Sequence, residues 1–313
     1  MQIRKGTHDD INDIVKLLKL SLGESLMPKT NEYWKWKHIK NPFGESDVLL
    51  AYDGNLLVGV RAFMKWIWCK SGTELKSVRA VDTVTHPEYQ GRGIFKKLTL
   101  QLVDECSKGD VALVYNTPNH KSAPGYLKMG WRKVGKLPVR VSFKKPVSVI
   151  INRIRKSGAT KFMSLNDVKF DLNLSDFDLG DINSTSTWTT QRSKEFIQWR
   201  YIDVPIVNYH SIAYKSAFII FRLKKGHLGK EVRIVDAFGD DKDRAAGLVK
   251  MWREVDFDYM SIVDLDHIKL PGLLGFKLRM GPLVTINCLK LEECHDSFNF
   301  ESWRPSLGDL ELF

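Results

Sequence analysis

Residues 81–94, Val-Asp-Thr-Val-Thr-His-Pro-Glu-Tyr-Gln-Gly-Arg-Gly-Ile, describe an apolar strand that breaks at Pro87 and enters a helix through Gly91 and Gly93. The first main-chain N–H groups of a helix have no partner within the helix, and they lie at the positive end of its dipole. A turn of this kind binds a phosphate group. The stretch therefore predicts a strand, a phosphate-binding loop and a helix, in this order.

Two common phosphate loops do not fit this stretch. A dinucleotide fingerprint requires a third glycine near Leu98, and a nucleoside triphosphatase loop requires Gly-Lys-Ser or Gly-Lys-Thr; the sequence has neither. The run Gln90–Gly93 instead resembles the Gln/Arg-x-x-Gly-x-Gly/Ala loop of the GNAT (GCN5-related N-acetyltransferase) superfamily. Phe95 departs from that pattern, because the family usually has a small residue there, and we expect the phosphate loop to sit slightly differently.

A second signature follows at the interval that the superfamily shows. Residues 119–131, Asn-His-Lys-Ser-Ala-Pro-Gly-Tyr-Leu-Lys-Met-Gly-Trp, resemble the GNAT pattern Asn-x-x-Ala/Ser…Tyr-x-x-x-Gly-Phe/Trp. Between the two signatures, helical spacing of apolar residues over 94–106 and the apolar run 111–115 predict a helix and a buried strand. Strand, helix and strand then form a right-handed crossover with parallel strands.

The N-terminal segment predicts the remaining parts of such a domain. Thr7 and Asp10 make a capping box before an amphipathic helix that runs to residue 22, and a second helix carries the aromatic residues of 33–39. A turn at 53–55 joins strands at 48–52 and 56–63, and 65–69 continues the sheet. The predicted fold class is α/β, with mixed, mostly antiparallel sheets that have a central βαβ crossover, splayed parallel strands and flanking helices.

The resemblance to GNAT enzymes, which transfer an acetyl group from acetyl-CoA to an amine, implies which residues act here. Tyr126 aligns with the family's tyrosine as the proton donor to the departing thiolate, and a phenol of pKa about 10 suits that role; the alternative is a tyrosine that only packs. Asn119 either orients the cofactor or makes an Asx turn. The cofactor-binding residues that the resemblance implies are Val84, Gln90, Gly91, Arg92, Gly93, Ile94, Phe95, Asn119 and Ser122.

The general base is not assigned by any motif. Asp82 lies two residues before Val84 on the same strand face, so its carboxylate is a candidate base, acting directly or through water. The alternative for Asp82 is a structural role in which it bonds the backbone or Arg79. The histidines are weaker candidates: His38, His86 and His120.

The composition restricts the class of protein. Residues 1–160 hold 28 Lys and Arg and 14 Asp and Glu, a net charge of +14, whereas residues 161–313 hold 20 and 23, a net charge of −3. A basic first half suits a polyanionic cofactor such as coenzyme A, and the sequence has no nucleic-acid-binding motif. No membrane span and no signal peptide are expected, so the predicted location is the cytoplasm.

The four cysteines are scattered and have no metal-ligand spacing. We therefore expect no metal site, and we expect reduced, mostly buried thiols. They are Cys69, Cys106, Cys288 and Cys294.

Three strings of the first half recur in the same order in the second half. They are Tyr33-x-x-Trp36-Lys-x-Ile39-x-x-Pro42 at Phe196 to Pro205, Lys76-x-Val-Arg-x-Val-Asp82 at Lys230 to Asp236, and Pro124-Gly-x-Leu127 at Pro271 to Leu274. The offset shrinks steadily from 163 to 154 to 147 residues. We favour two GNAT-like domains in tandem, with an unrelated α/β domain as the alternative.

The second half lacks the chemistry of the first. Carboxylates fill the run 238–243 where a phosphate loop would lie, and Leu273 replaces Tyr126, so one cofactor site is expected. Asp236 is the counterpart of Asp82 in a half that should not catalyse, which favours a structural role for both, beside Arg79 and Arg233.

The expected organisation is a catalytic GNAT domain at 1–145, a linker with a short basic helix at 146–165, and a degenerate GNAT-like domain at 166–313. The linker helix either docks on a domain or touches an anionic membrane. The chain is expected to be a monomer with an internal pseudo-dimer, or a homodimer, without a nucleic acid partner.

The expected reaction is transfer of an acetyl group from acetyl-CoA to a primary amine of a small-molecule acceptor, for example an amino sugar, by direct attack in a ternary complex. One alternative is a Fem-like aminoacyl or peptidyl transferase that uses charged tRNA. A second alternative is a non-catalytic acyl-CoA-binding module.

Overall fold

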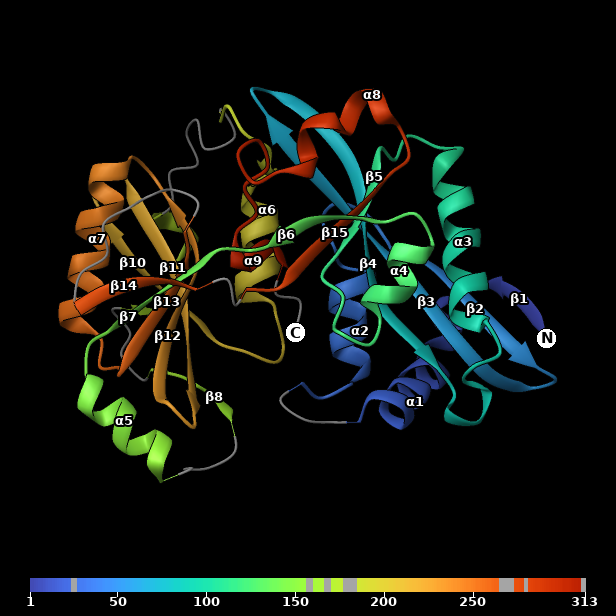
Figure 1. Ribbon diagram of the computed structural model, residues 1–313, viewed down its shortest axis with the longest axis horizontal. Helices are drawn as coiled ribbons and strands as arrows, with labels where there is room; N and C mark the ends of the chain where they lie inside the picture. Colours follow the sequence, from blue (N-terminus) through green and yellow to red (C-terminus); the bar gives the residue numbers. More distant parts are fainter. Residues whose placement is uncertain are drawn as a thin grey trace. The chain divides into compact units, whose positions relative to one another are not determined.

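The computed structural model describes residues 1–23, 27–155, 160–165, 170–176, 185–264, 273–278 and 281–310. The chain divides into two compact units, and each unit is built from separate stretches of sequence. The first consists of Met1–Gly135, Thr185–Gln191 and Pro282–Trp303, and the second of Lys136–Ser184, Arg192–Gly281 and Arg304–Phe313. Each unit is a mixed sheet flanked by helices (Figure 1).

The first unit contains a sheet with the strand order β1-β2-β3-β4-β5-β15-β6, and the short strand β9 pairs with β3. The ladder between β4 and β5 is parallel, and those of β3 with β4 and of β15 with β5 are antiparallel. The mixed, mostly antiparallel sheet predicted from the sequence is thereby confirmed. Its strands are β1 (Gln2–Lys5), β2 (Asp47–Asp53), β3 (Leu56–Lys70), β4 (Thr73–Thr85), β5 (Leu113–Asn116), β6 (Arg132–Lys136), β9 (Thr189–Thr190) and β15 (Leu283–Cys288).

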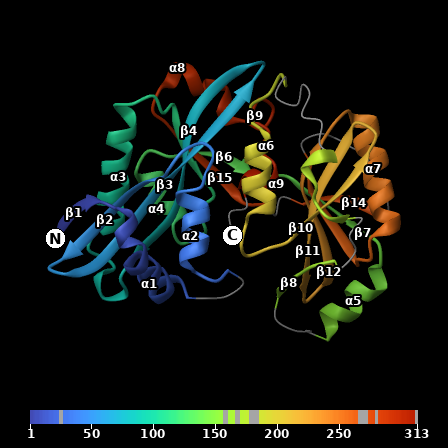
Figure 2. The ribbon, with the colours of Figure 1, turned by 180° about the vertical axis from the view of Figure 1, so that it is seen from behind.

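Helices cover both faces of this sheet (Figures 1 and 2). Apolar residues of α1 pack on one face with Val60 and Val84, and apolar residues of α3 pack on the other with Phe63 and Val78. The capping box predicted at Thr7 forms, because the Asp10 carboxylate accepts from the Thr7 N–H at 2.8 Å. The helices are α1 (Ile11–Leu22), α2 (Asn31–His38), α3 (Ile94–Ser107), α4 (Ala123–Lys128) and α8 (Leu291–Cys294).

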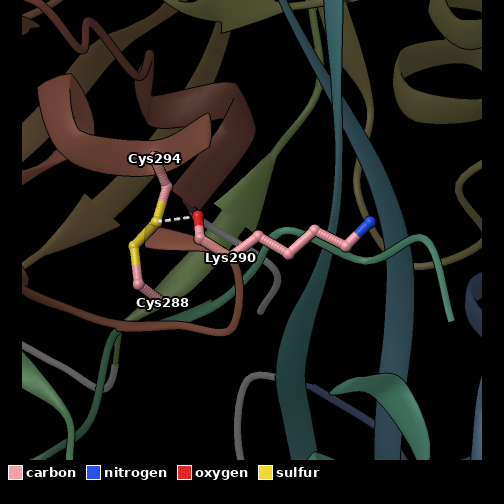
Figure 3. The surroundings of a disulfide bond; sticks show 3 residues. All are labelled: Cys288, Lys290 and Cys294. Atoms are coloured by element: carbon pink, nitrogen blue, oxygen red, sulfur yellow. Dashed lines mark hydrogen bonds between the residues drawn. A yellow bond between two sulfur atoms is a disulfide. The ribbon is translucent and has the colours of Figure 1, made fainter. Parts of the chain in front are cut away.

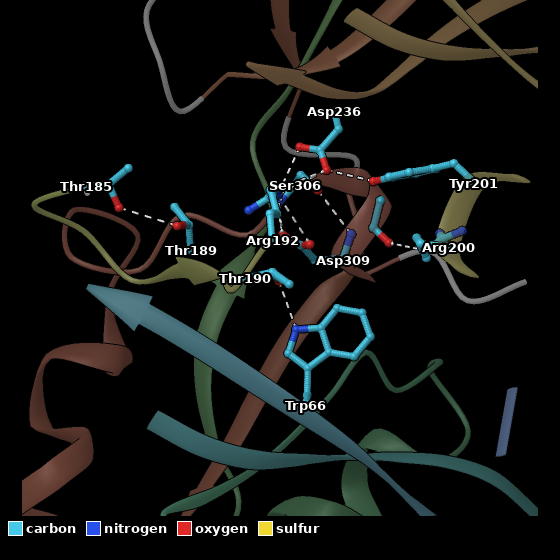
Figure 4. Close-up of polar contacts among 11 residues, drawn as sticks. Trp66, Thr185, Thr189, Thr190, Arg192, Arg200, Tyr201, Asp236, Ser306 and Asp309 are labelled. Carbon is cyan, nitrogen blue, oxygen red and sulfur yellow. Dashed lines mark hydrogen bonds and ion pairs between the residues drawn. The ribbon is translucent and has the colours of Figure 1, made fainter. Parts of the chain in front are cut away.

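Strand β3 is longer than predicted. The sequence suggested two strands within 56–69, whereas the structure has one strand of 15 residues, because side chains on both of its faces are buried. Its far end carries Trp66 and Trp68, which pack with Tyr115. The indole Nε1 of Trp66 donates to Thr190 Oγ1 at 2.9 Å (Figure 4). This aromatic cluster holds β9 on the sheet.

The second unit contains a sheet with the order β10-β11-β12-β13-β7-β14, and β8 pairs with β11. Its strands are β7 (Val139–Phe143), β8 (Lys161–Met163), β10 (Tyr209–Tyr214), β11 (Ala217–Gly226), β12 (Gly229–Phe238), β13 (Tyr259–Val263) and β14 (Leu273–Leu278). Its helices are α5 (Pro146–Ile154), α6 (Lys194–Ile197), α7 (Asp241–Glu254) and α9 (Leu307–Leu310). A π-helical segment, Gln198–Ile202, continues α6.

The two sheets share one pattern of pairing. In the first, Ser77–Arg79 pairs in parallel with Leu113–Tyr115, and in the second, Glu231–Arg233 pairs in parallel with Tyr259–Ser261. These β4 and β12 segments are 154 residues apart, which is the offset of the repeated string. The topology is thus compatible with two GNAT-like halves.

A late strand of each half pairs in the sheet of the other half. Strand β15 lies between β5 and β6 in the first sheet, and β7 lies between β13 and β14 in the second. The compact units therefore interleave along the sequence. The division of the chain into domains at 1–145 and 166–313 stays a prediction.

One pair of cysteines differs from the prediction. Cys288 at the end of β15 and Cys294 in α8 form a disulfide, with their Cα atoms 6.3 Å apart (Figure 3). The expectation of reduced thiols is wrong here, because the tight connection from β15 to α8 turns the two side chains toward each other. Cys69 and Cys106 are buried and form no disulfide, as expected.

The described residues include neither a membrane-spanning helix nor a cluster of metal-binding side chains. No helix there is long and apolar enough to cross a membrane. No group of three or more His, Cys, Asp or Glu side chains in the same ranges has an arrangement that could hold a metal ion.

Candidate active site

The predicted phosphate loop connects β4 to α3 and is exposed. A short 3₁₀ turn, Pro87–Tyr89, follows β4, and the backbone then passes through Gly91 at φ +78° and Gly93 at φ +76°. Both glycines have left-handed conformations that disfavour other residues. A Cβ added at either would meet no heavy atom within 4 Å. The loop therefore presents its main chain to open space.

The N-terminus of α3 has no carboxylate of its own. Gly93 is its N-cap, no side chain caps it, and its first turn contains no acidic residue. The corresponding end of α7 is different, because the Asp240 side chain accepts from the Asp243 N–H at 2.9 Å. An anion can thus bind the first-turn N–H groups of α3, whereas carboxylates already occupy the start of α7.

Arg92 is held beside this loop. Its guanidinium lies 4.4 Å from the centroid of the Tyr89 ring and donates to the Glu88 carbonyl at 3.1 Å. The Tyr89 hydroxyl donates in turn to Asp53 at 2.9 Å. These contacts keep a positive charge at the exposed loop.

The parallel strands part close to the loop. The β4–β5 ladder ends at the pair Arg79 and Tyr115, although β4 continues to Thr85. On β4 the pairing thus ends five residues before Val84. Val84 pairs instead with Val60 of β3. A bulge opposite Arg61, with Asp82 at φ +42°, accompanies the separation.

Tyr126 and Phe95 come together between α4 and α3. The Tyr126 side chain is buried, and its ring makes edge-to-face contacts with Phe95 at 5.3 Å and with Trp131 at 5.2 Å. A Cβ added at Gly125 would lie 2.9 Å from the Phe95 ring, so Phe95 packs directly on α4. The residue that departs from the family pattern therefore links the loop to Tyr126.

Asn119 makes the Asx turn that was one of its two predicted roles. Its Oδ1 accepts from the N–H groups of Lys121 and Ser122, each at 3.0 Å. The Ser122 hydroxyl also contacts Asn119 Oδ1 at 3.2 Å. Both side chains thus fix the backbone at the start of α4.

Asp82 lies on the face of the sheet that α1 and α2 cover, opposite the face of Tyr126. Its carboxylate accepts from Lys37 Nζ at 2.7 Å and contacts His38 Nε2 at 2.8 Å. Arg79 was one of the two partners predicted for Asp82, the other being the backbone, and Arg79 is not its partner; the Arg79 guanidinium donates to Thr117. Helix α2, which lies above the bulge, supplies both partners.

Burial and the contacts within this trio act together on the pKa values of its members. It lowers the pKa of the Lys37 ammonium and of the His38 imidazole below their usual ranges. Burial alone would raise the pKa of the Asp82 carboxyl, but Lys37 and His38 together hold that pKa well below its usual range. Asp82 is therefore ionised near neutral pH. A pocket reaches the trio, and it is lined by Val15, Leu18, Lys29, Thr30, Tyr33, Trp34, Lys37, His38 and Asp82.

The second unit contains a matching aspartate. The Tyr201 hydroxyl donates to Asp236 at 2.7 Å, as His38 contacts Asp82 in the first unit (Figure 4). Tyr201 and Asp236 follow His38 and Asp82 at the offsets of the repeated strings. Arg192 also donates to Asp236, at 2.9 Å, and Arg233 pairs with Glu231 rather than with Asp236. Arg233, one of the partners suggested for Asp236, is therefore not its partner.

One residue of the site escaped the sequence reasoning. Arg61 of β3 is fully buried, and its guanidinium lies 5.4 Å from the centroid of the Tyr126 ring. The sequence carried a signal, because arginine is rare in a buried strand and the run 57–64 is otherwise apolar.

The comparisons with known proteins agree on the fold. A family model described as an acetyltransferase (GNAT) domain matches residues 2–134. No curated protein gives a match.

Solved structures match almost the whole chain. A GCN5-related N-acetyltransferase from Anabaena variabilis is 15% identical, with a TM-score of 0.68 over 94% of this chain and 74% of that one. A conserved protein of unknown function from Enterococcus faecalis, described as a probable N-acyltransferase, is 14% identical, with a TM-score of 0.65 and the same coverage. Eis1 from Mycobacterium abscessus is 11% identical, with a TM-score of 0.59 over 93% and 75%. At these identities the likeness shows the fold.

Proposed function

We propose that this chain, whose residues 2–134 match an acetyltransferase (GNAT) domain, transfers an acetyl group from acetyl-CoA to a primary amine of a small molecule, such as an amino sugar. The observation that carries the proposal is the exposed left-handed loop before α3. Gly91 and Gly93 give it a bare main chain, and no carboxylate of the first turn competes for the N–H groups. A helix end of this kind suits the diphosphate of coenzyme A.

The residues of the loop would hold the cofactor. The N–H groups from Gln90 to Phe95, Ile94 included, are the proposed donors to the diphosphate, and Arg92 adds a positive charge fixed by Tyr89. Val84 lies on the part of β4 that no longer pairs with β5, which supports a role beside the pantetheine arm. Asn119 and Ser122 are proposed to act indirectly, by shaping the start of α4. When bound, acetyl-CoA supplies an activated acetyl thioester.

Tyr126 is the proposed acid. Transfer to an amine leaves a thiolate, which a positioned phenol can protonate. Phe95 and Trp131 both make edge-to-face contacts with the Tyr126 ring, which fixes the orientation of the ring and of its hydroxyl. Phe95 belongs to the helix whose N-terminus would bind the diphosphate, and this supports placing donor and cofactor together.

We propose a structural role for Asp82. A general base is effective when its pKa lies near the working pH, and the pKa of Asp82 is held far below that range by Lys37. Asp82 instead ties α2 to the bulge of β4. We infer that the base is water or another group, and that the pocket lined by Tyr33 and Lys29 is where an acceptor approaches this face.

A panel of amines tests the proposal. Purified protein is mixed with acetyl-CoA and each amine, and release of free thiol is followed. The proposal expects amine-dependent thiol release and an acetylated product for at least one small amine. Binding of acetyl-CoA without thiol release from any amine would argue for a non-catalytic module, and protection from heat by charged tRNA but not by acetyl-CoA would argue for an aminoacyl transferase.

A further inference from the structure

Arg61 is a buried cation enclosed by aromatic rings. The Arg61 side chain is fully buried. Its guanidinium carbon lies 4.9 Å from the ring centroid of Phe63, 5.4 Å from that of Tyr126 and 5.9 Å from that of Phe95. Two of these rings belong to the proposed site, since Phe95 is the second residue of α3 and Tyr126 the proposed acid. Arg61 therefore lies directly behind the site.

The guanidinium lacks an acceptor. None of its three nitrogens has a hydrogen-bond partner among the residues that the structure describes. A guanidinium offers five N–H donors, stays charged at any ordinary pH, and is costly to bury without an anion. Ring faces attract a cation, but they do not satisfy its donors. The charge and the open donors of such a group suit an anionic ligand atom.

The arginine occurs only in the unit with the phosphate loop. In the first sheet Phe63 pairs with Ala80, and in the second sheet Phe221 pairs with Ile234. Ile234 is the counterpart of Ala80, because the two are separated by the 154-residue offset of the repeat, so Phe221 is the counterpart of Phe63. By this register Ile219 is the counterpart of Arg61. Ile219 packs in an apolar core beside α7, the helix that begins with carboxylates. The cation thus accompanies the loop that can hold the cofactor.

We propose that Arg61 binds the sulfur of coenzyme A as a thiolate and thereby stabilises the leaving group. This inference rests on the proposed function. The exposed loop at Gly91 accounts for the diphosphate, whereas Arg61 is deeper, next to the tyrosine that would protonate sulfur. Preorganised charge in a dry site acts most strongly where negative charge develops during reaction.

Acetyl transfer needs only the amine, the thioester, water, Arg61 and Tyr126. The amine nitrogen forms the C–N bond and loses a proton to water, and the C–S bond breaks with its electron pair passing to sulfur. Arg61 holds the negative charge that develops there. Tyr126 then donates its phenolic proton to the sulfur and recovers a proton from solvent.

A titration of bound coenzyme A tests the inference without turnover. The ultraviolet absorbance of the thiolate is followed against pH for coenzyme A bound to the wild-type protein, Arg61→Met and Arg61→Lys. Coenzyme A without its sulfur gives the binding baseline. Arg222→Met is the matched control, because Arg222 is also buried in a strand, with its guanidinium 5.0 Å from the Phe162 ring, but belongs to the second unit.

We expect the bound thiol of the wild type to ionise about 1 to 3 pH units lower than that of Arg61→Met, since a cation within a few ångströms favours the charged form to this extent. Arg61→Lys should keep part of the shift, and Arg222→Met all of it. Arg61→Met should still fold, because replacing an unpaired buried charge by an apolar side chain relieves its desolvation; urea denaturation checks this.

Three results would overturn the inference. The first is that the thiol of bound coenzyme A has the same pKa in the wild type and in Arg61→Met. This result would leave the proposed function unaffected. The second is an equal loss of the shift in Arg222→Met. The third is an Arg61-dependent gain in affinity for an acyl-CoA whose acyl chain ends in a carboxylate, with no change in the pKa of the coenzyme A thiol. Arg61 would then bind a carboxylate of the acyl group and not the sulfur. Failure of coenzyme A to bind the wild type would instead refute the proposed function itself.

Discussion

The substitution Gly93→Ala separates a cofactor site from an ordinary turn. Gly93 has φ +76°, and a Cβ there would meet no heavy atom within 4 Å. The cost to folding is therefore backbone strain alone, about 1–2 kcal/mol for an L-residue in the left-handed region. A bound diphosphate would change this, because the new methyl group would stand where the ligand approaches the main chain.

Gly54→Ala is the matched control. Gly54 lies in the turn between β2 and β3, has φ +58°, and also has no heavy atom within 4 Å of an added Cβ. The two variants should lose a similar free energy of unfolding in urea. Calorimetry with acetyl-CoA should separate them: we expect Gly93→Ala to bind at least tenfold more weakly than the wild type, about 1.4 kcal/mol, and Gly54→Ala to bind normally.

A Gly93→Ala protein that binds acetyl-CoA as tightly as the wild type, while it is destabilised like Gly54→Ala, would refute a cofactor role for the loop. The loop would then be a turn that only joins β4 to α3. Equal weakening of binding in both variants would also refute it, because the effect would come from lost stability rather than from contact with the ligand.

Three further predictions concern Tyr126 and the buried trio. Tyr126→Phe should lower kcat about 10²-fold or more at saturating acetyl-CoA with little change in acetyl-CoA affinity; an unchanged kcat would remove Tyr126 from the mechanism. Lys37→Met removes the cation paired with the buried Asp82 carboxylate, which then keeps only its contact with His38, and should lower the free energy of unfolding by about 3–5 kcal/mol. The exposed Lys35→Met should stay near wild type. The pKa of Asp82 is lowered on folding, so its stabilisation should be present above pH about 4 and lost as pH falls below that, toward the folded pKa. Urea midpoints between pH 6 and 3 should therefore fall more steeply in the wild type than in Asp82→Asn, and parallel slopes would contradict the ion pair.

Local signals predicted the core of the first unit well. The glycines at 91 and 93, the capping box at Thr7 and the turn at 53–55 act over a few residues, and each formed where its chemistry required. The long strand β3 was divided wrongly, because a strand that is buried on both faces has no alternation to read.

The sequence did not predict contacts between residues far apart in the chain. The partners of Asp82 come from α2, 44 and 45 residues earlier in the chain, and proximity in sequence favoured Arg79 instead. The repeat did predict that Asp82 and Asp236 would be alike, and the contacts with His38 and Tyr201 agree with that.

The strand pairing across the halves could not be foreseen either. Strand β15 pairs with β5 from about 170 residues away in sequence, at Thr285 and Asn116. A hydrophobic pattern indicates that a strand is buried, but it does not say which sheet the strand joins. Arg61 was missed for a related reason. Its proposed role depends on its closeness to Phe95 and Tyr126, and only the fold brings these residues together.

The central claim is that the main chain before α3 binds the diphosphate of coenzyme A, and the amide signals of Gly91 and Gly93 report on it directly. Protein labelled with ¹⁵N only at glycine is titrated with acetyl-CoA, and Gly91→Ala and Gly93→Ala identify the two signals. Both signals should move in step with saturation of the ligand, while that of Gly54 stays in place. Acetyl-CoA that saturates the protein without moving either signal, or that does not bind, would contradict the account.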